Sequence, residues 1–248
     1  MNWSDQGVVL SARRHGESSL IVALMTASHG SHVGLIRGGA NRRGRGVYEP
    51  GNFVTVEWQA RLENHLGTFT CELVEAKAAL LLNNPCKLAC LSSACAVTEY
   101  ALPEREPHPL FYCTFKDLII SLDTKRWIES YVFWEINILA ELGFGLELNV
   151  CAATGRKNQL AYVSPKSGRA VSESAGKYYH DKLLPLPTFL TPHRETTEHP
   201  STADFLTGLK LSGYFLNRHI FTHYKNGEPA ARTRLIDRLK QSATISCR

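Results

Sequence analysis

The sequence predicts a multidomain α+β protein, with an N-terminal β-barrel in residues 1–80 and an α-helical domain in residues 81–248. Three observations lead to this prediction. Between residues 6 and 75, apolar and polar residues alternate with the two-residue period of β-strands. From residue 83 onward, the apolar spacing becomes helical. Residues 149–182 lose this helical spacing and contain several glycines, so we expect an irregular hairpin module inserted among the helices.

Five short strands, separated by glycine-rich turns, are expected in the barrel. In the fourth strand, Val54, Val56 and Trp58 share one face, as they do in a strand with one apolar and one solvated side. Closing such strands into a barrel removes their exposed edges, and five strands in about 70 residues fit an OB-fold. The predicted strands span residues 6–13, 19–26, 31–37, 52–61 and 66–74.

The helical domain begins after an Asn-Pro start signal at Asn84 and Pro85. Strongly apolar helical runs follow, and Gly143 ends the one before the insert. A linker with four prolines precedes the next helical run, and the residues after Gln241 are expected to fray. The helical runs after the first cover residues 110–122, 128–142 and 201–222, and the linker covers residues 183–200.

Composition and missing motifs restrict the function. The N-terminus has no basic, apolar signal segment and no stretch reaches the roughly 18 apolar residues of a membrane span, so we expect a cytoplasmic protein. Motifs for nucleotide hydrolysis and for acyl transfer are absent, so we expect no enzyme activity. Seven cysteines without a C-x-x-C pair indicate reduced thiols. Cys86 and Cys90 could share a helix face as metal ligands, but their apolar neighbours favour simple packing, so neither a metal nor another cofactor is expected.

The net charge is only +5, but the positive charge is concentrated in the glycine-rich stretch RGGANRRGRGVYEPG, residues 37–51. Glycine lets the backbone approach a phosphate chain, and a guanidinium group binds phosphate oxygens in pairs at any working pH. We therefore expect this loop to contact nucleic acid, although a solvated loop without function is the alternative. The predicted contacts are Arg37, Arg42, Arg43 and Arg45.

Two further features extend this basic patch. Arg13 and Arg14 end the first predicted strand and join the patch if the barrel closes. Tyr48, beside the arginines, is the candidate for stacking on a base, whereas Trp58 is expected in the core.

A second run of basic residues lies near the C-terminus. It either extends the nucleic-acid track, receives an acidic peptide, or forms a helix face that only keeps the domain soluble. The run comprises Lys210, Arg218, Lys225, Arg232, Arg234, Arg238 and Lys240.

The order of several segments resembles the RecO family of bacterial recombination mediators. GVVLSARRHGESSLIVALMTASHGSHVGLIRGG, EPGNFVTVEW and LGTFTCELVEA carry the resemblance between residues 7 and 76. FWEINILAELGFG, then CAATG at residues 151–155 and YVSPKSGRAVS at residues 162–172, continue it. The resemblance therefore covers nearly the whole chain.

This resemblance implies an OB-fold followed by a helical domain that carries a zinc-ribbon-like insert. It also implies a DNA repair protein, associated with the nucleoid, that binds single- and double-stranded DNA and anneals complementary strands. The implied partners are RecR and the single-strand-binding protein, and the implied outcome is loading of the RecA recombinase. An RNA-binding OB protein and an unrecognised hydrolase are the competing hypotheses.

The insert departs from the zinc-containing members of the family, which carry two C-x-x-C pairs. Only Cys151 is present here, and Thr154, Val171 and Ser174 are expected at the other ligand positions. One thiolate cannot complete a tetrahedral site, so we expect a degenerate insert without zinc.

A docking site for the tail of the single-strand-binding protein is expected on the helical domain. Lys125 and Arg126, beside apolar residues, offer positive charge to an acidic, apolar tail.

Overall fold

The computed structural model describes residues 1–41, 44, 46–191, 200–225 and 227–246. The chain divides into two compact units, each of which is described by itself. The first comprises Met1–Asp123 and Pro229–Leu235, and the second Thr124–Glu228 and Ile236–Arg248. The predicted domain boundary near residue 80 stays a prediction, since the first unit also takes in the helices that follow the barrel.

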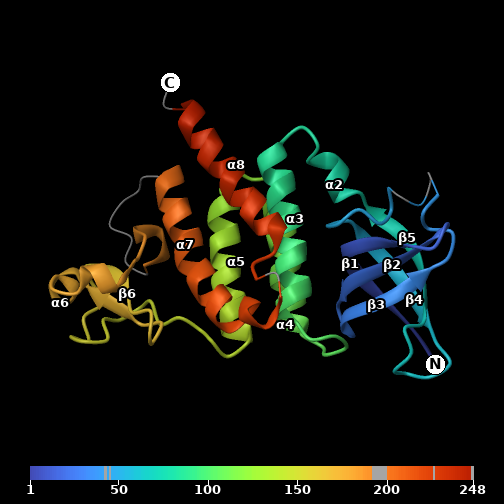
Figure 1. The fold of residues 1–248 in the computed structure, drawn as a ribbon, viewed down its shortest axis with the longest axis horizontal. Helices are drawn as coiled ribbons and strands as arrows, with labels where there is room; N and C mark the ends of the chain where they lie inside the picture. The colour runs from blue at the N-terminus through green and yellow to red at the C-terminus, as the bar shows by residue number, and fades with distance from the viewer. Residues whose placement is uncertain (42–43, 45, 192–199, 226, 247–248) are drawn as a thin grey trace. The chain divides into compact units, whose positions relative to one another are not determined.

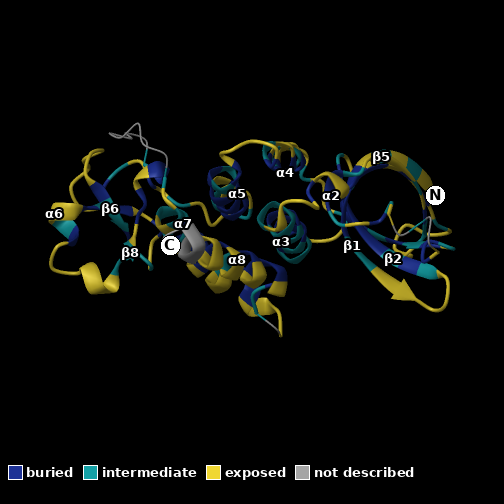
Figure 2. Cartoon of the chain, turned by 90° about the horizontal axis from the view of Figure 1, so that it is seen from above, coloured by how far each residue is buried: buried dark blue, intermediate teal, exposed yellow. Residues whose placement is uncertain are grey.

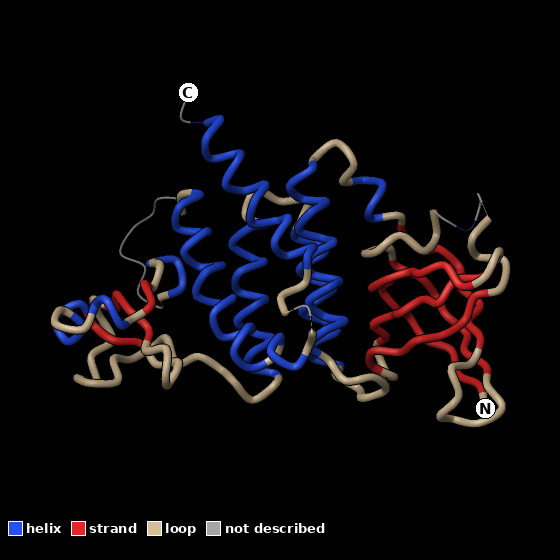
Figure 3. The backbone as a smooth tube through the Cα atoms, viewed as in Figure 1, coloured by secondary structure: helices blue, strands red, loops and turns tan. Residues whose placement is uncertain are grey.

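The first unit begins with a closed five-stranded barrel, drawn from blue to cyan in Figure 1 and as strands in Figure 3. Its strand order is β1-β2-β3-β5-β4, and only the β3 and β5 pair is parallel. This closed order confirms the predicted OB-fold. The strands are β1 Asn2–His15, β2 Ser19–Thr26, β3 Gly30–Ile36, β4 Phe53–Gln59 and β5 Thr68–Glu75.

The long first strand closes the barrel because it pairs with a different neighbour along each half. Residues 2–8 pair with β4, and residues 7–15 pair with β2. A register shift between Val9 and Ser11 allows the strand to bend from one partner to the other. β1 therefore starts four residues before the predicted strand at residue 6.

The barrel interior holds the alternating apolar residues that the sequence pattern predicted. Val54, Val56 and Trp58 are all at most 2% exposed, together with Phe69 from β5. Figure 2 shows both buried and exposed residues along the barrel strands. Packing is close, since a Cβ atom at Gly34 would lie 2.6 Å from the Phe69 ring.

Helices of the first unit cover one side of the barrel. They are α2 Lys77–Leu80, α3 Pro85–Ala101 and α4 Pro109–Ser121. The Asn84 side chain caps α3 by accepting a hydrogen bond from the Lys87 amide, as the Asn-Pro signal predicted. The Ser11 hydroxyl donates to the Glu99 carboxylate over 2.8 Å and joins β1 to α3.

The second unit combines two helices with a small sheet. In α5, Trp127–Glu141, the buried Glu135 carboxylate accepts a hydrogen bond from Ser212 of α7, Thr202–His219. Two strands of the predicted insert and one strand from the predicted linker form a three-stranded antiparallel sheet in the order β7-β6-β8. The insert contains β6 Leu160–Val163, β7 Ala170–Ser172, α6 Glu173–Gly176 and a 3-10 turn at His180–Lys182. The residues that follow it form β8 Leu184–Pro185 and a 3-10 turn at Thr188–Leu190, and a further 3-10 turn, Phe221–His223, follows α7.

The last helix, α8 Ala230–Ser246, contributes residues to both units. Its helical structure continues past Gln241, where fraying was expected. Among the described helices, none has the length and apolar character that a membrane crossing requires.

Candidate nucleic-acid interface

Three of the predicted arginine contacts are gathered at one end of the barrel. Arg14 pairs across β1 and β2 with Leu20, and Leu20 pairs across β2 and β3 with Ile36, which precedes Arg37. Neighbouring strands lie about 5 Å apart, so the backbones of Arg14 and Arg37 are roughly 10 Å apart. Both side chains and that of Arg13 are exposed. We find no ion pair between these three and the described carboxylates.

The loop between β3 and β4 is fixed at both of its described ends. At the start, the Ala40 amide donates to the Ser18 carbonyl over 3.0 Å. At the end, the buried Asn52 side-chain amide donates to the carbonyls of Gly46 and Val47, and its oxygen accepts from the Ala78 amide. The loop is therefore held against the β1–β2 turn that follows Arg14. Arg42, Arg43 and Arg45 lie outside the described residues.

Tyr48 does not offer the exposed ring that stacking on a base requires. Its side chain is 9% exposed and belongs to the barrel core with Leu20 and Ile36. Burial raises the pKa of its hydroxyl to about 12, with a smaller contribution from Cys71. We therefore correct the stacking prediction for Tyr48 because its ring closes the apolar interior beneath the arginine loop.

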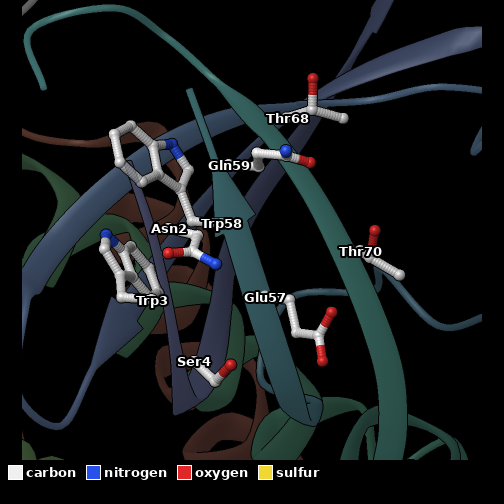
Figure 4. Close-up of a pocket in the computed structure, with 8 residues that line it drawn as sticks. All are labelled: Asn2, Trp3, Ser4, Glu57, Trp58, Gln59, Thr68 and Thr70. Atoms are coloured by element: carbon white, nitrogen blue, oxygen red, sulfur yellow. The ribbon is translucent and has the colours of Figure 1, made fainter. Parts of the chain in front are cut away.

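The outer face of β1, β4 and β5 differs from the basic end in charge. A hollow of about 240 Å³ there is lined by six polar side chains and by Trp3 and Trp58, and Figure 4 shows Glu57 and Thr70 along it. A neighbouring hollow adds Asp5 and Glu72. Neither hollow is lined by a lysine or an arginine, so the positive charge of the described barrel residues is not spread evenly.

The two predicted docking residues of the second unit, Lys125 and Arg126, differ in whether Glu129 pairs with them. The Arg126 guanidinium donates to both carboxylate oxygens of Glu129, over 3.0 and 2.7 Å. These hydrogen bonds, followed by the negative charge of Glu129, raise the pKa of Arg126 above its usual value. Lys125 is exposed. An acidic peptide that binds Arg126 would therefore have to compete with Glu129. Binding to Lys125 would not require that the Arg126–Glu129 pair is broken.

The second basic run is not one continuous exposed face. Arg232 is only 1% exposed, so this residue does not belong to a solvated basic helix face, which was one of the three alternatives. Arg218 donates a hydrogen bond to the Pro165 carbonyl in the second unit. The remaining described members are on the surface to differing degrees and stay candidates for an anionic partner.

The insert does not provide the donors of a structural zinc site. The Cys151 thiol is 2% exposed and donates to the Ser172 hydroxyl over 3.4 Å, while the Ser172 amide donates to its sulfur over 3.2 Å. Burial raises the pKa of this thiol, but hydrogen bonds from Ser172, Thr154 and backbone amides outweigh it and lower the pKa to about 6. The β7 residue that contacts the sulfur is therefore Ser172. It is next to Val171, which was expected at a ligand position. Neutral hydroxyl groups do not replace thiolates around zinc.

An aromatic cluster at the β2–β3 turn was not predicted as a site. It brings together Trp3, His29, His32 and Trp58, four rings from separate segments. Trp58 was expected in the core, but nothing in the sequence around the two histidines indicates that these four rings meet.

The closed barrel, its basic end and the helices that follow define a class: OB-fold proteins with an appended helical domain. The chain matches two family models, "Recombination protein O N terminal" over residues 1–76 and "Recombination protein O C terminal" over residues 82–228. The chain belongs to this recombination protein O family, as the resemblance indicated. The family gives it a role in DNA repair and recombination.

Curated relatives agree over almost their whole length. The chain is 50% identical over 248 residues to the "DNA repair protein RecO" of Rhodospirillum centenum, which covers 99% of this chain and 98% of the relative. It is 44% identical to the protein of the same name in Rhodospirillum rubrum, with 97% of each chain covered. A third, from Methylobacterium nodulans, is 46% identical over 94% of this chain and 95% of its own.

Proposed function

We propose that this protein is a recombination mediator that binds single- and double-stranded DNA and anneals complementary strands. We further propose that it helps to load the RecA recombinase onto DNA coated by single-strand-binding protein, in the cytoplasm at the nucleoid. It does so without catalysing a reaction, as a partner of RecR and of the coating protein. Family membership supports the repair role, and the basic end of the barrel supports the DNA contact.

The observation that carries the proposal is the placement of Arg13, Arg14 and Arg37 at one end of an OB barrel. Arginines there replace condensed counterions on the phosphate chain, and their release drives binding. The predicted contacts Arg42, Arg43 and Arg45 lie in the loop that starts from the same end. A strand held by its phosphates keeps its base edges available, which is what pairing with a complementary strand needs.

The salt dependence of single-strand binding tests this proposal. For single strands, the slope of log affinity against log salt changes by about 0.7 for each phosphate contact. The variant Arg13→Ala/Arg14→Ala should therefore reduce the slope by about 1.4 if both residues contact phosphate. Lys166→Ala/Lys177→Ala, in the insert, removes the same charge elsewhere and should change the slope less.

An annealing assay, together with a comparison of RNA and DNA binding, separates the proposal from its alternative. A protein that serves DNA repair should anneal complementary DNA strands, whereas an RNA-binding OB protein should prefer RNA and promote no DNA annealing. An unchanged slope in the Arg13→Ala/Arg14→Ala variant would remove these residues from the interface.

We also propose that the acidic tail of single-strand-binding protein docks at Lys125 and Arg126. Lys125 supplies the available charge, and Arg126 joins only by leaving Glu129. Replacing both residues with alanine should weaken binding of a tail peptide. Glu129→Gln should strengthen it, because this change frees the guanidinium group.

A further inference from the structure

Three aromatic rings form a continuous stack at the end of the barrel opposite Arg14. The Trp3 indole lies on the His29 imidazole, with centroids 4.1 Å apart and planes within 9°. Its other neighbour is Trp58, whose centroid is 5.7 Å away with planes inclined by 19°. Figure 4 shows the two indoles near each other beside β1 and β4. Trp58 is buried, so the stack rises from the barrel core to the surface at His29.

His29 is held in this position by contacts that do not depend on a ligand. Its Nδ1 lies 3.0 Å from the Asp5 carboxylate, which also accepts a hydrogen bond from the Ser28 amide over 2.7 Å. One third of the His29 side chain is exposed. The surface end of the stack is therefore an oriented flat ring that is open to solvent.

The stack borders a cavity of about 410 Å³, with Glu63, Arg105 and Pro107 on its other sides. Such a volume is within the range of about 300–1,000 Å³ that is usual for ligand sites. Arg105 has a left-handed backbone with φ of 65°, a conformation that non-glycine residues adopt only when the surroundings impose it. Its guanidinium donates to the carbonyls of Glu63 and His65, and its amide donates to the Ser31 carbonyl over 2.7 Å.

The floor of the cavity is uncharged at neutral pH. His32 is 4% exposed and meets Trp3 edge to face at 5.2 Å. Burial lowers its pKa to about 4, and the charges of Arg105 and His29 add to this effect against an opposing hydrogen bond with the Val33 carbonyl. A neutral aromatic floor with a cation and a carboxylate at the rim favours a flat, polar-edged group over an aliphatic one.

We propose that this cavity binds one unpaired base of a single DNA strand, stacked on the outer face of the His29 ring. Stacking extends the ring series of His29, Trp3 and Trp58, and bases stack on aromatic side chains whatever their sequence. Glu63 can accept a hydrogen bond from an exocyclic amino group, and the charge of Arg105 attracts the adjoining phosphate. This inference rests on the proposed DNA-binding function and adds a base contact to it.

The position of the cavity fits a strand that also reaches the arginines. β2 runs from the neighbourhood of Arg14 to the turn that carries His29, and its eight residues span about 25 Å. OB-folds bind nucleic acid across strands 2 and 3, with footprints of about four nucleotides or more. One strand along β2 and β3 can therefore place its phosphates at Arg14 and a base at His29.

The test compares an intact single strand of about 12 nucleotides with an abasic strand of the same length, which keeps the phosphates and lacks the bases. The readout is the ratio of the two affinities. The intact protein should bind the intact strand about tenfold tighter, as expected for one stacked base. His29→Ala should bring the ratio close to one, and His29→Phe, which keeps a flat ring, should restore most of it.

The matched control is Arg13→Ala/Arg14→Ala, which should weaken binding of both strands and leave the ratio of the two affinities unchanged. A ratio that stays near tenfold in a folded His29→Ala variant would overturn the base-binding inference and leave the proposed function standing. If the intact protein binds neither strand, the proposed function itself is wrong. Near-ultraviolet circular dichroism of each variant checks that the tryptophan stack is retained.

Discussion

The Lys77 amine lies 2.6 Å from the Asp123 carboxylate, and the two side chains differ greatly in exposure. Only 3% of the lysine side chain is exposed, against 58% of the aspartate. Glu75 approaches the same amine at 3.6 Å. The pair joins the start of α2 to the last residue of the first unit's longer segment, and its cost of desolvation falls mainly on the lysine.

This asymmetry predicts that the two partners are not equivalent in mutagenesis. Lys77→Met leaves only solvated carboxylates and should lower the free energy of unfolding by about 1 kcal/mol or less. Asp123→Ala leaves a buried ammonium group with one distant carboxylate and should cost about 1–3 kcal/mol. Urea unfolding of both variants measures the difference. A larger loss for Lys77→Met would contradict this explanation.

Gly30 and Gly16 provide a matched pair of left-handed glycines, with φ of 66° and 64°. A Cβ atom at Gly30 would lie 1.9 Å from the Glu106 carbonyl oxygen, whereas one at Gly16 would meet nothing within 4 Å. Gly16→Ala should therefore cost only about 1–2 kcal/mol of backbone strain. Gly30→Ala should cost about 1–3 kcal/mol more, because the 103–107 loop must move. Equal thermal stability of the two variants would show that this loop is not packed against the turn.

The lowered pKa of His32 predicts that the free energy of unfolding decreases in acid. Its pKa is about 4 in the folded protein, against 6.5 for the free side chain. Between these values the unfolded chain binds a proton that the folded chain does not, so the free energy of unfolding falls as the pH drops from 6.5 to 4. The loss should approach about 3 kcal/mol. His32→Gln should flatten this part of the pH profile; a profile parallel to that of the unmodified protein would exclude His32 as its source.

The insert should be stable without metal. Cys151 is hydrogen-bonded to Ser172 in place of a second thiolate, so the purified protein should contain far less than one zinc per chain. A chelator should leave thermal unfolding unchanged. One tightly held zinc per chain, lost together with stability on chelation, would contradict this.

The barrel was predictable because short apolar segments are separated by glycine-rich turns and β4 shows a clear apolar alternation. The first four residues of β1 escaped because Asn2 and Ser4 pair with β4 on a polar outer face, which gives no hydropathy signal. Arg232 was misplaced for a related reason. A basic residue in a basic helix predicts exposure, and its burial depends on neighbours that only the fold supplies.

The two ends of the barrel also differ in whether the sequence alone could indicate them. Arg37 and its neighbours form a compositional signal within a single loop, so the sequence was enough to indicate them. The cavity at His29 depends on Trp3 and Trp58, which barrel closure brings together, and on Arg105, which the segment after α3 holds against Ser31. No short-range pattern contains that information.

The most direct test of the mediator function and of the assigned DNA site is annealing of complementary single strands coated with their binding protein. We compare the unmodified chain with a variant that carries alanine at Arg37, Arg42, Arg43 and Arg45, after circular dichroism has shown that the variant is folded. We expect rapid annealing by the unmodified protein and loss of most of that activity in the variant. Normal annealing by the variant would contradict the assigned DNA site, and absence of annealing and DNA binding in both would contradict the mediator function.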